Sequence, residues 1–298
     1  MNAYCRLCKA TAVLKESHII PAFVYRWMKD SSATGYIRSG NAANLRVQDG
    51  EKRYLLCFAC EQRLSKWETA FAENLFHPLI VDGGRKIAYQ EWLLKFCVSI
   101  SWRVLTLYAN DGLLDNLSEQ QRVDFDLVLK KWSDFLLGIE HNPGQHEQHF
   151  IPLGPVDELT VDGMPKNINR YFLRAGDYVV ATGDNGTFVY SKFAQFIIVG
   201  FISYSYPKQW VGTKIRVNNG VIGRDQITFP QTFLDFIFDR CRRVAQIDSS
   251  ISPNQQAKIR ATLKSDIEGS AKSATFHAIE HDIKLFGRSA IHPEKSVE

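Results

Sequence analysis

The sequence lacks any apolar run long enough to cross a membrane. Its longest strongly apolar stretch covers residues 193–204, whereas a membrane-spanning helix needs about 20 apolar residues. Residues 1–6 also lack the apolar segment of a secretory signal. These absences argue against a membrane partner and an exported protein, and we expect a cytoplasmic protein.

The sequence also contains no internal repeat and no low-complexity tract. Its 298 residues are 45% hydrophobic and 23% charged, which is typical of a soluble folded chain. We therefore expect disorder only at the ends. The length is sufficient for two domains, and we place them at residues 1–86 and 87–298.

Positive charge in excess is confined to the first of these parts. Residues 1–86 hold 13 Lys and Arg against 8 Asp and Glu, an excess of five positive charges, whereas residues 87–298 hold 23 against 24. Four thiolates with one Zn²⁺ would contribute a charge of about −2. A modest basic surface remains, of the kind that contacts phosphates, although scattered solvated Lys and Arg would give the same count.

Four of the six cysteines form two Cys-x-x-Cys pairs: Cys5 with Cys8, and Cys57 with Cys60. Two residues between thiolates allow one tight turn to present both sulfurs to a tetrahedral metal, and two such pairs complete its ligands. The 48 residues between the pairs are no obstacle, because loop closure costs little compared with metal binding. We predict a structural zinc site. Cys97 and Cys241 stand alone in apolar segments and are expected to be core residues.

The pattern predicts an α+β chain. In residues 1–86 we expect an extended run at 11–14, a helix opened by Pro21, a loop with a short hairpin at 30–50, and a second helix from Cys60 to about Leu75. Helices are expected within 87–140, at about 89–108 and 118–139, the second with a capping box at Ser118. Strands of an antiparallel sheet are expected within 149–228, at 171–174, 178–182, 187–190, 196–204 and 210–217, with a hairpin turn at 183–186 between two of them. Helices are expected within 230–286, at 230–247 and 253–286.

The N-terminal pieces resemble a known family by their order. A first Cys-x-x-Cys is followed by His18-x-x-Pro21 and by Asn44 next to a Leu. A Leu-Cys-x-x-Cys motif then opens a helix, and Glu61 directly follows its last cysteine. This order resembles the HNH, or His-Me finger, endonucleases with a zinc-stapled ββα-metal (treble-clef) unit. The resemblance covers residues 1 to about 80.

The resemblance implies a role for each matching residue. His18 would be the general base that deprotonates the attacking water, because an imidazole titrates near neutral pH. Asn44 would hold the far ring nitrogen of His18 and so fix its tautomer. Glu61 would bind Mg²⁺ or Mn²⁺, which stabilises the leaving 3′ oxygen.

The chain departs from the family pattern in two places. Such nucleases usually have Asp, Glu or His directly before the catalytic His, and here Ser17 stands there. A hydroxyl alone is a poor metal ligand, so the site needs another carboxylate if Ser17 cannot bind the ion. Glu68 lies on the same helical stripe as Glu61 but about 10 Å further along the axis, which is too far for easy sharing of one ion. The stretch between Asn44 and Cys57 is also longer than usual, which leaves Asn41 as an alternative to Asn44.

The implied activity is hydrolysis of DNA phosphodiester bonds, as single-strand nicks because one such site cuts one strand. A bacterial nuclease of this kind would serve defence against phage or foreign DNA. Residues 87–298 would recognise the substrate, bind a protein partner or restrain the nuclease. Two alternatives remain: a non-catalytic zinc module that binds nucleic acid or protein, and a toxin-like RNase that uses His18 without a divalent ion.

Overall fold

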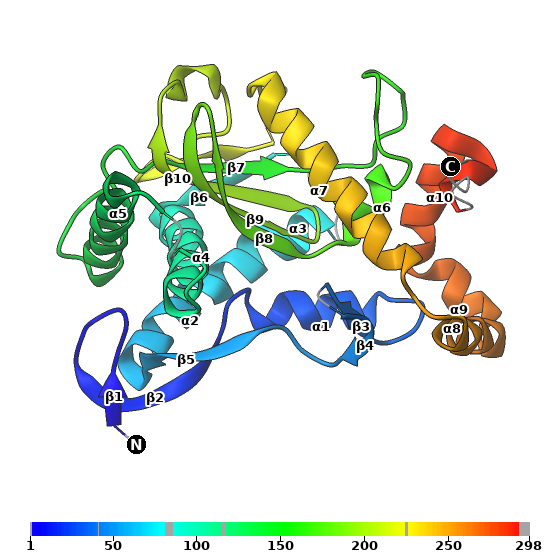
Figure 1. The fold of residues 1–298 in the computed structure, drawn as a ribbon, viewed down its shortest axis with the longest axis horizontal. Coiled ribbons are helices and arrows are strands. Elements are labelled where there is room, and N and C mark those ends of the chain that lie inside the picture. Colours follow the sequence, from blue (N-terminus) through cyan, green and yellow to red (C-terminus); the bar gives the residue numbers. More distant parts are fainter. Residues whose placement is uncertain (1, 41, 81–85, 115–116, 224–225, 292–298) are drawn as a thin grey trace.

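The computed structural model describes residues 2–40, 42–80, 86–114, 117–223 and 226–291. It has a mixed α and β architecture with antiparallel sheets and helices at the C-terminal end, as the sequence predicts. Figure 1 shows the N-terminal strands along one side of the molecule and the four-stranded central sheet beside them.

The N-terminal part is built on a small antiparallel sheet with the strand order β1-β2-β5. Between β2 and β5 lie a helix and a short hairpin, both of which the sequence predicts. A helix follows β5 directly and continues through a π-helical turn at Ala72–Phe76 into a further short helix. The elements are β1 (Asn2–Tyr4), β2 (Thr11–His18), α1 (Ala22–Asp30), β3 (Ile37–Ser39), β4 (Ala42–Val47), β5 (Lys52–Cys57), α2 (Phe58–Phe71) and α3 (His77–Ile80).

Two long helices follow. A short strand, β6 (Ile87–Gln90), leads into α4 (Glu91–Asn110), and α5 (Glu119–Leu137) comes next. Ser118 accepts a hydrogen bond from the backbone N–H of Gln121, whose side chain accepts one from Ser118 in return. The predicted capping box is thereby confirmed. Most of α4 is buried, because it packs against α2, α5 and the central sheet at once.

The central sheet has the antiparallel order β7-β10-β9-β8. Its strands are β7 (Gln148–Pro152), β8 (Asp177–Gly183), β9 (Gly186–Phe193) and β10 (Phe196–Tyr204). The β8–β9 turn pairs Gly183 with Gly186, as the sequence predicts. A Cβ at Gly186 would lie 2.1 Å from the Ser203 carbonyl oxygen, so only glycine fits there.

Two predicted strands are wrong. Residues 171–174 belong to α6 (Ile168–Arg174), and residues 210–217 form only isolated bridges at Val211 and Lys214, after a 3₁₀ turn at Pro207–Gln209. A short apolar run does not distinguish a strand from a buried helical turn. The strand that does form nearby is β11 (Asn219–Ile222), which pairs with β6.

The C-terminal region is helical, with one correction. The helix predicted after Pro230 is confirmed as α7 (Gln231–Ser249), whereas the single helix predicted for 253–286 is divided into α8 (Pro253–Ser265), α9 (Ile267–Lys272) and α10 (Ala274–Phe286). Asp266 and Ser273 cause the breaks, because their side chains accept hydrogen bonds from the first turns of α9 and α10. A final 3₁₀ turn covers Gly287–Ala290.

The hydrophobic core is continuous from the N-terminal sheet through α4 to one face of the central sheet. Phe71 of α2 lies at its centre and stacks on Phe96 of α4, with ring centroids 3.9 Å apart. The other face of the sheet packs on α6 and α7. Within the described ranges, no helix is long and apolar enough to cross a membrane.

Replacing Phe71 with Ala should strongly destabilise the whole chain. The ring is fully buried, and removal of a buried Phe side chain costs about 3–5 kcal/mol. We expect a matching loss in the free energy of unfolding, measured by denaturant titration. Phe276→Ala, at a ring that is 46% exposed, is the control. Equal losses in the two variants would contradict the central role of Phe71.

Candidate metal centre and the polar residues beside it

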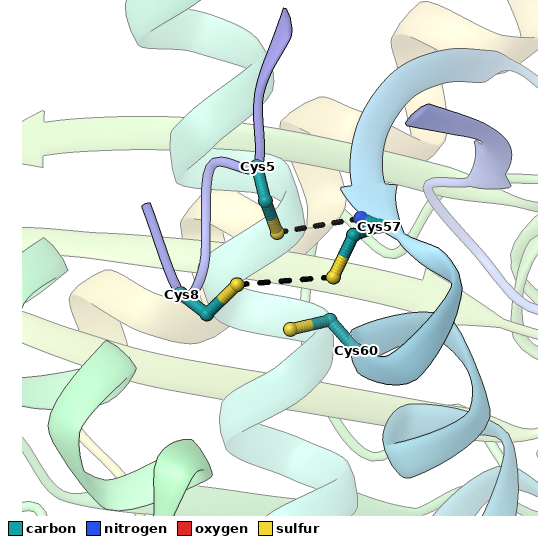
Figure 2. A group of neighbouring side chains, drawn as sticks. All are labelled: Cys5, Cys8, Cys57 and Cys60. Carbon is teal, nitrogen blue, oxygen red and sulfur yellow. Dashed lines mark hydrogen bonds between the residues drawn. The ribbon is translucent and has the colours of Figure 1, made fainter. Parts of the chain in front are cut away.

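Two pairs of sulfur atoms from distant parts of the chain meet in one cluster. The Sγ atoms of Cys5, Cys8, Cys57 and Cys60 all lie within 4.8 Å of one another (Figure 2). Cys8 Sγ and Cys57 Sγ are 3.8 Å apart. Four ligands on a tetrahedral Zn²⁺, with Zn–S bonds of about 2.3 Å, would place their sulfurs about 3.8 Å apart. The cluster therefore fits a metal such as zinc.

Local backbone structure positions each pair. Between β1 and β2 the chain makes a tight turn, in which Lys9 N donates to Cys5 O and Cys5 N donates to Ala10 O. Lys9 adopts a φ of 63°, in the left-handed region. Cys57 ends β5, and Cys60 lies in the first turn of α2. The cluster thus joins the first turn of the chain to the start of α2.

Electrostatics favours a bound cation at this cluster. Burial disfavours the thiolate of Cys5, but backbone hydrogen bonds, chiefly from Cys57, outweigh it and lower its pKa to about 7. Burial and the nearby Cys5 raise the pKa of Cys60. A cation removes this opposition because it stabilises all four thiolates together. Among the residues that the structure describes, no other group of three or more His, Cys, Asp or Glu side chains could hold an ion.

Ser17 and Glu61 meet beside the cysteine cluster. Glu61 follows Cys60 in the first turn of α2, and Ser17 is the penultimate residue of β2. Ser17 Oγ donates a 2.7 Å hydrogen bond to Glu61 Oε2. The hydroxyl side chain is buried, whereas Glu61 borders a shallow hollow of about 680 Å³ along the outer face of α2. The two residues that the family resemblance assigns to the catalytic metal are therefore in contact.

His18 ends β2 and faces a different carboxylate. Its Nε2 atom lies 2.9 Å from Asp49 Oδ2, and Lys52 Nζ lies 2.8 Å from the same oxygen. The Nε2 atom is buried, and the Asp49 oxygen lies in contact with it but off the line of a ring N–H. Burial disfavours the Asp49 carboxylate, but the hydrogen bonds from Lys52 and His18 outweigh it and lower the pKa of Asp49 to about 2.

Glu68 is held by an arginine. Arg103 of α4 is 3% exposed and forms an ion pair with Glu68 of α2. Its other terminal nitrogen donates to the backbone oxygen of His18, at 3.3 Å. Removing one partner of such a buried pair is strongly destabilising, because an uncompensated charge remains. Glu68 therefore binds α2 to α4, and through Arg103 to the end of β2.

Asn44 contacts another part of the chain. Its Oδ1 atom accepts a 2.8 Å hydrogen bond from the backbone N–H of Ser252, directly before α8. The neighbour of the His18 ring is Asp49 instead. The alternative residue, Asn41, lies outside the described residues.

Sequence reasoning missed Asp49 and Arg103. Asp49 is followed by Gly50, a common turn signature, and nothing else in the local pattern distinguishes it. Arg103 stands in the middle of an apolar helix, where a charged residue signals a buried partner. That signal identifies a polar contact but cannot name the partner.

Comparisons with protein-family models, with curated proteins and with solved structures find no significant match to this chain. The function of the chain must therefore be inferred from its own residues.

Replacing Cys57 with Ser should remove the metal. We expect purified wild type to contain one zinc per chain, and Cys57→Ser to lose it together with several kcal/mol of stability, because binding and folding of such sites are coupled. Cys97→Ser is the control, since Cys97 is buried away from the cluster. Elemental analysis and the absorption of the cobalt-substituted protein measure the metal. Equal zinc content in all three proteins would contradict the assignment.

The stability contributed by Asp49 should decrease in acid. Its folded pKa of about 2 lies below the unfolded value, which is about 3.9, so the contribution is complete above about pH 4 and disappears as the pH falls toward 2. The side chain is 38% exposed, so screening limits the contribution to less than about 1 kcal/mol. Denaturation of wild type and Asp49→Asn across this range tests the sign. A difference that grows with acidity would contradict it.

Proposed function

We propose that this chain is a metal-dependent endonuclease of the HNH type, with a zinc-stapled treble-clef module at its N-terminus. The observation that carries the proposal is the arrangement of side chains at the end of β2. There His18, the candidate base, directly follows Ser17, which contacts Glu61 next to the cysteine cluster. A water-activating group and an oxygen-rich pair are thus adjacent in the chain.

The proposed reaction is hydrolysis of a phosphodiester. His18 takes a proton from water, the water oxygen forms a bond to phosphorus, and the bond from phosphorus to the 3′ oxygen breaks. The leaving oxygen then takes a proton from solvent. Consecutive strand residues point to opposite sides, so a phosphate would contact both His18 and an ion at Ser17 only beyond the end of β2, where the strand no longer separates the two side chains.

Glu61 and Ser17 would hold the divalent ion. Mg²⁺ commonly binds proteins through one or two carboxylates and keeps several waters, so one carboxylate with one hydroxyl oxygen fits it. When bound, the ion would neutralise charge developing on the leaving oxygen. Glu61 would supply the charged ligand, and Ser17 would exchange its hydrogen bond with Glu61 for a contact to the ion. Glu68 would not bind the ion directly, since its carboxylate is paired with Arg103.

The positive excess in residues 1–86 supports a nucleic-acid substrate, and we propose DNA. A single site of this kind would nick one strand. Defence against foreign DNA is the biological role that agrees with this chemistry. Residues 87–298 would bind DNA or a protein partner, and their contacts with the N-terminal part also support the site.

One observation favours a second function. The hydroxyl of Ser17 is buried, and its hydrogen bond to Glu61 satisfies it without a metal. A non-catalytic zinc module that binds nucleic acid or protein would retain this contact unchanged. Such a module would keep its affinity for DNA when His18 is replaced.

Supercoiled plasmid tests the two functions. Wild type with Mg²⁺ or Mn²⁺ should convert it to open circles, and both His18→Ala and Glu61→Gln should slow the conversion by on the order of 10²-fold or more. His277→Ala is the control, because this ring on α10 is 59% exposed. Zinc content and binding of DNA are measured for every variant.

Three outcomes separate the candidates. Cutting by the wild type and the control, lost in both site variants that retain zinc, supports the endonuclease. Binding without cutting, unchanged in His18→Ala, identifies the zinc-stapled binding module. Cleavage of RNA that persists in EDTA while the zinc is retained would instead indicate a nuclease that uses His18 without a divalent ion.

A further inference from the structure

The contact between Asp49 and His18 has a direct chemical consequence for the imidazole ring. Neutral imidazole carries its proton on one nitrogen and a lone pair on the other. An ionised carboxylate only accepts hydrogen bonds, so the Nε2 atom beside Asp49 Oδ2 must carry the proton. The lone pair is then left on Nδ1.

The Nδ1 atom is free to act as a base. Within the described part of the chain, Nδ1 has no hydrogen-bond partner. It is also not among the buried polar atoms without a partner, so it is open to solvent. The His18 side chain is 20% exposed, so solvent reaches the ring. The Tyr25 ring lies beside it, with centroids 6.3 Å apart and planes 30° from parallel.

Asp49 is itself held in place. Its Oδ1 atom accepts a 2.9 Å hydrogen bond from Gly50 N, while Lys52 holds Oδ2. Gly50 must be glycine here, because a Cβ would lie 2.0 Å from the Tyr25 ring. The next residue, Glu51, accepts a 3.0 Å hydrogen bond from Ile19 N through its backbone oxygen. The segment that carries Asp49 is therefore tied to the residue that follows His18.

The central sheet secures the same segment from the other side. The hydroxyl of Tyr178, on β8, donates to the Glu51 carboxylate, and Arg53 pairs with that carboxylate as well. The segment that carries Asp49 is thus held by contacts at Gly50, Glu51 and Lys52. A side chain held in this way can orient a neighbouring ring more precisely than one on a free loop.

We propose that Asp49 is the positioning residue of His18, which holds the imidazole in the Nε2–H tautomer and leaves Nδ1 to take the proton from water. The proposal rests on the proposed function and deepens it, since it names the base atom and the group that orients it. Asp49 acts through His18 and does not touch the substrate. Lys52 supports it by keeping the carboxylate ionised and oriented.

The test combines a spectroscopic measurement with kinetics. Selective ¹⁵N labelling of the histidine rings reports the tautomer of each ring, and His18→Gln identifies the His18 signals. We expect the Nε2–H tautomer in wild type. In Asp49→Asn an amide that can donate replaces the carboxylate, so the Nδ1–H tautomer should become populated. Asp239→Asn, at an exposed carboxylate paired only with Arg242 among the described residues, should leave the His18 signals unchanged.

Plasmid nicking by the same proteins gives the kinetic arm. Asp49→Asn should lower kcat by on the order of 10²-fold while KM stays within about twofold, because the effect is on the base and not on substrate binding. Asp49→Glu should recover part of kcat, since it retains an accepting carboxylate. Asp239→Asn should cut at the wild-type rate.

The two arms distinguish failure of this proposal from failure of the proposed function. A wild-type ring in the Nδ1–H tautomer, or a tautomer that Asp49→Asn leaves unchanged, overturns the positioning role even if the protein cuts DNA. A tautomer that changes as expected in a protein that cuts no nucleic acid overturns the proposed function and leaves the orientation of His18 by Asp49 intact. Unchanged kcat in a zinc-loaded Asp49→Asn also overturns the proposal.

Discussion

The meeting of four cysteine sulfurs is the constraint on which the candidate site depends. Cys5 and Cys8 lie in the turn between β1 and β2, while Cys57 and Cys60 lie where β5 passes into α2. Thiolates this close repel one another unless a cation holds them. A cation bound there would fix the start of α2 against β2 and would thereby hold Glu61 next to Ser17, with which it shares a hydrogen bond.

The N-terminal part does not stand apart from the rest of the chain. Its core continues into α4, where Phe71 stacks on Phe96. Arg103 of α4 binds both Glu68 and the backbone of His18, and Arg174 of α6 donates a 2.7 Å hydrogen bond to Met28 O in α1. These buried polar contacts are specific in position, so they hold β2 and α2 in one relative placement. Residues 87–298 therefore contribute to the site even where they carry none of its chemistry.

Residues assigned from the family pattern divided into two groups. One group came together where the β1–β2 turn, the end of β2 and the junction of β5 with α2 meet: Cys5, Cys8, Cys57, Cys60, Ser17 and Glu61. Asn44 and Glu68 did not join them and contact Ser252 and Arg103 instead. Asp49 stands where Asn44 was expected, next to the ring of His18. The segment between Asn44 and β5 is longer than in the family pattern, and Asp49 lies within this segment.

The sequence by itself determined the elements with strong local signals: the paired cysteines, the capping box of α5, the β8–β9 turn and the helices α1, α4 and α7. Each depends on residues a few positions apart. Only the tertiary structure decided that 171–174 is helical, that 253–286 forms three helices, and that Asp49 and Arg103 reach His18. Arg103 and His18 are 85 residues apart in sequence. Such contacts depend on which elements pack together, and the local periodicity of the sequence does not indicate which elements will do so.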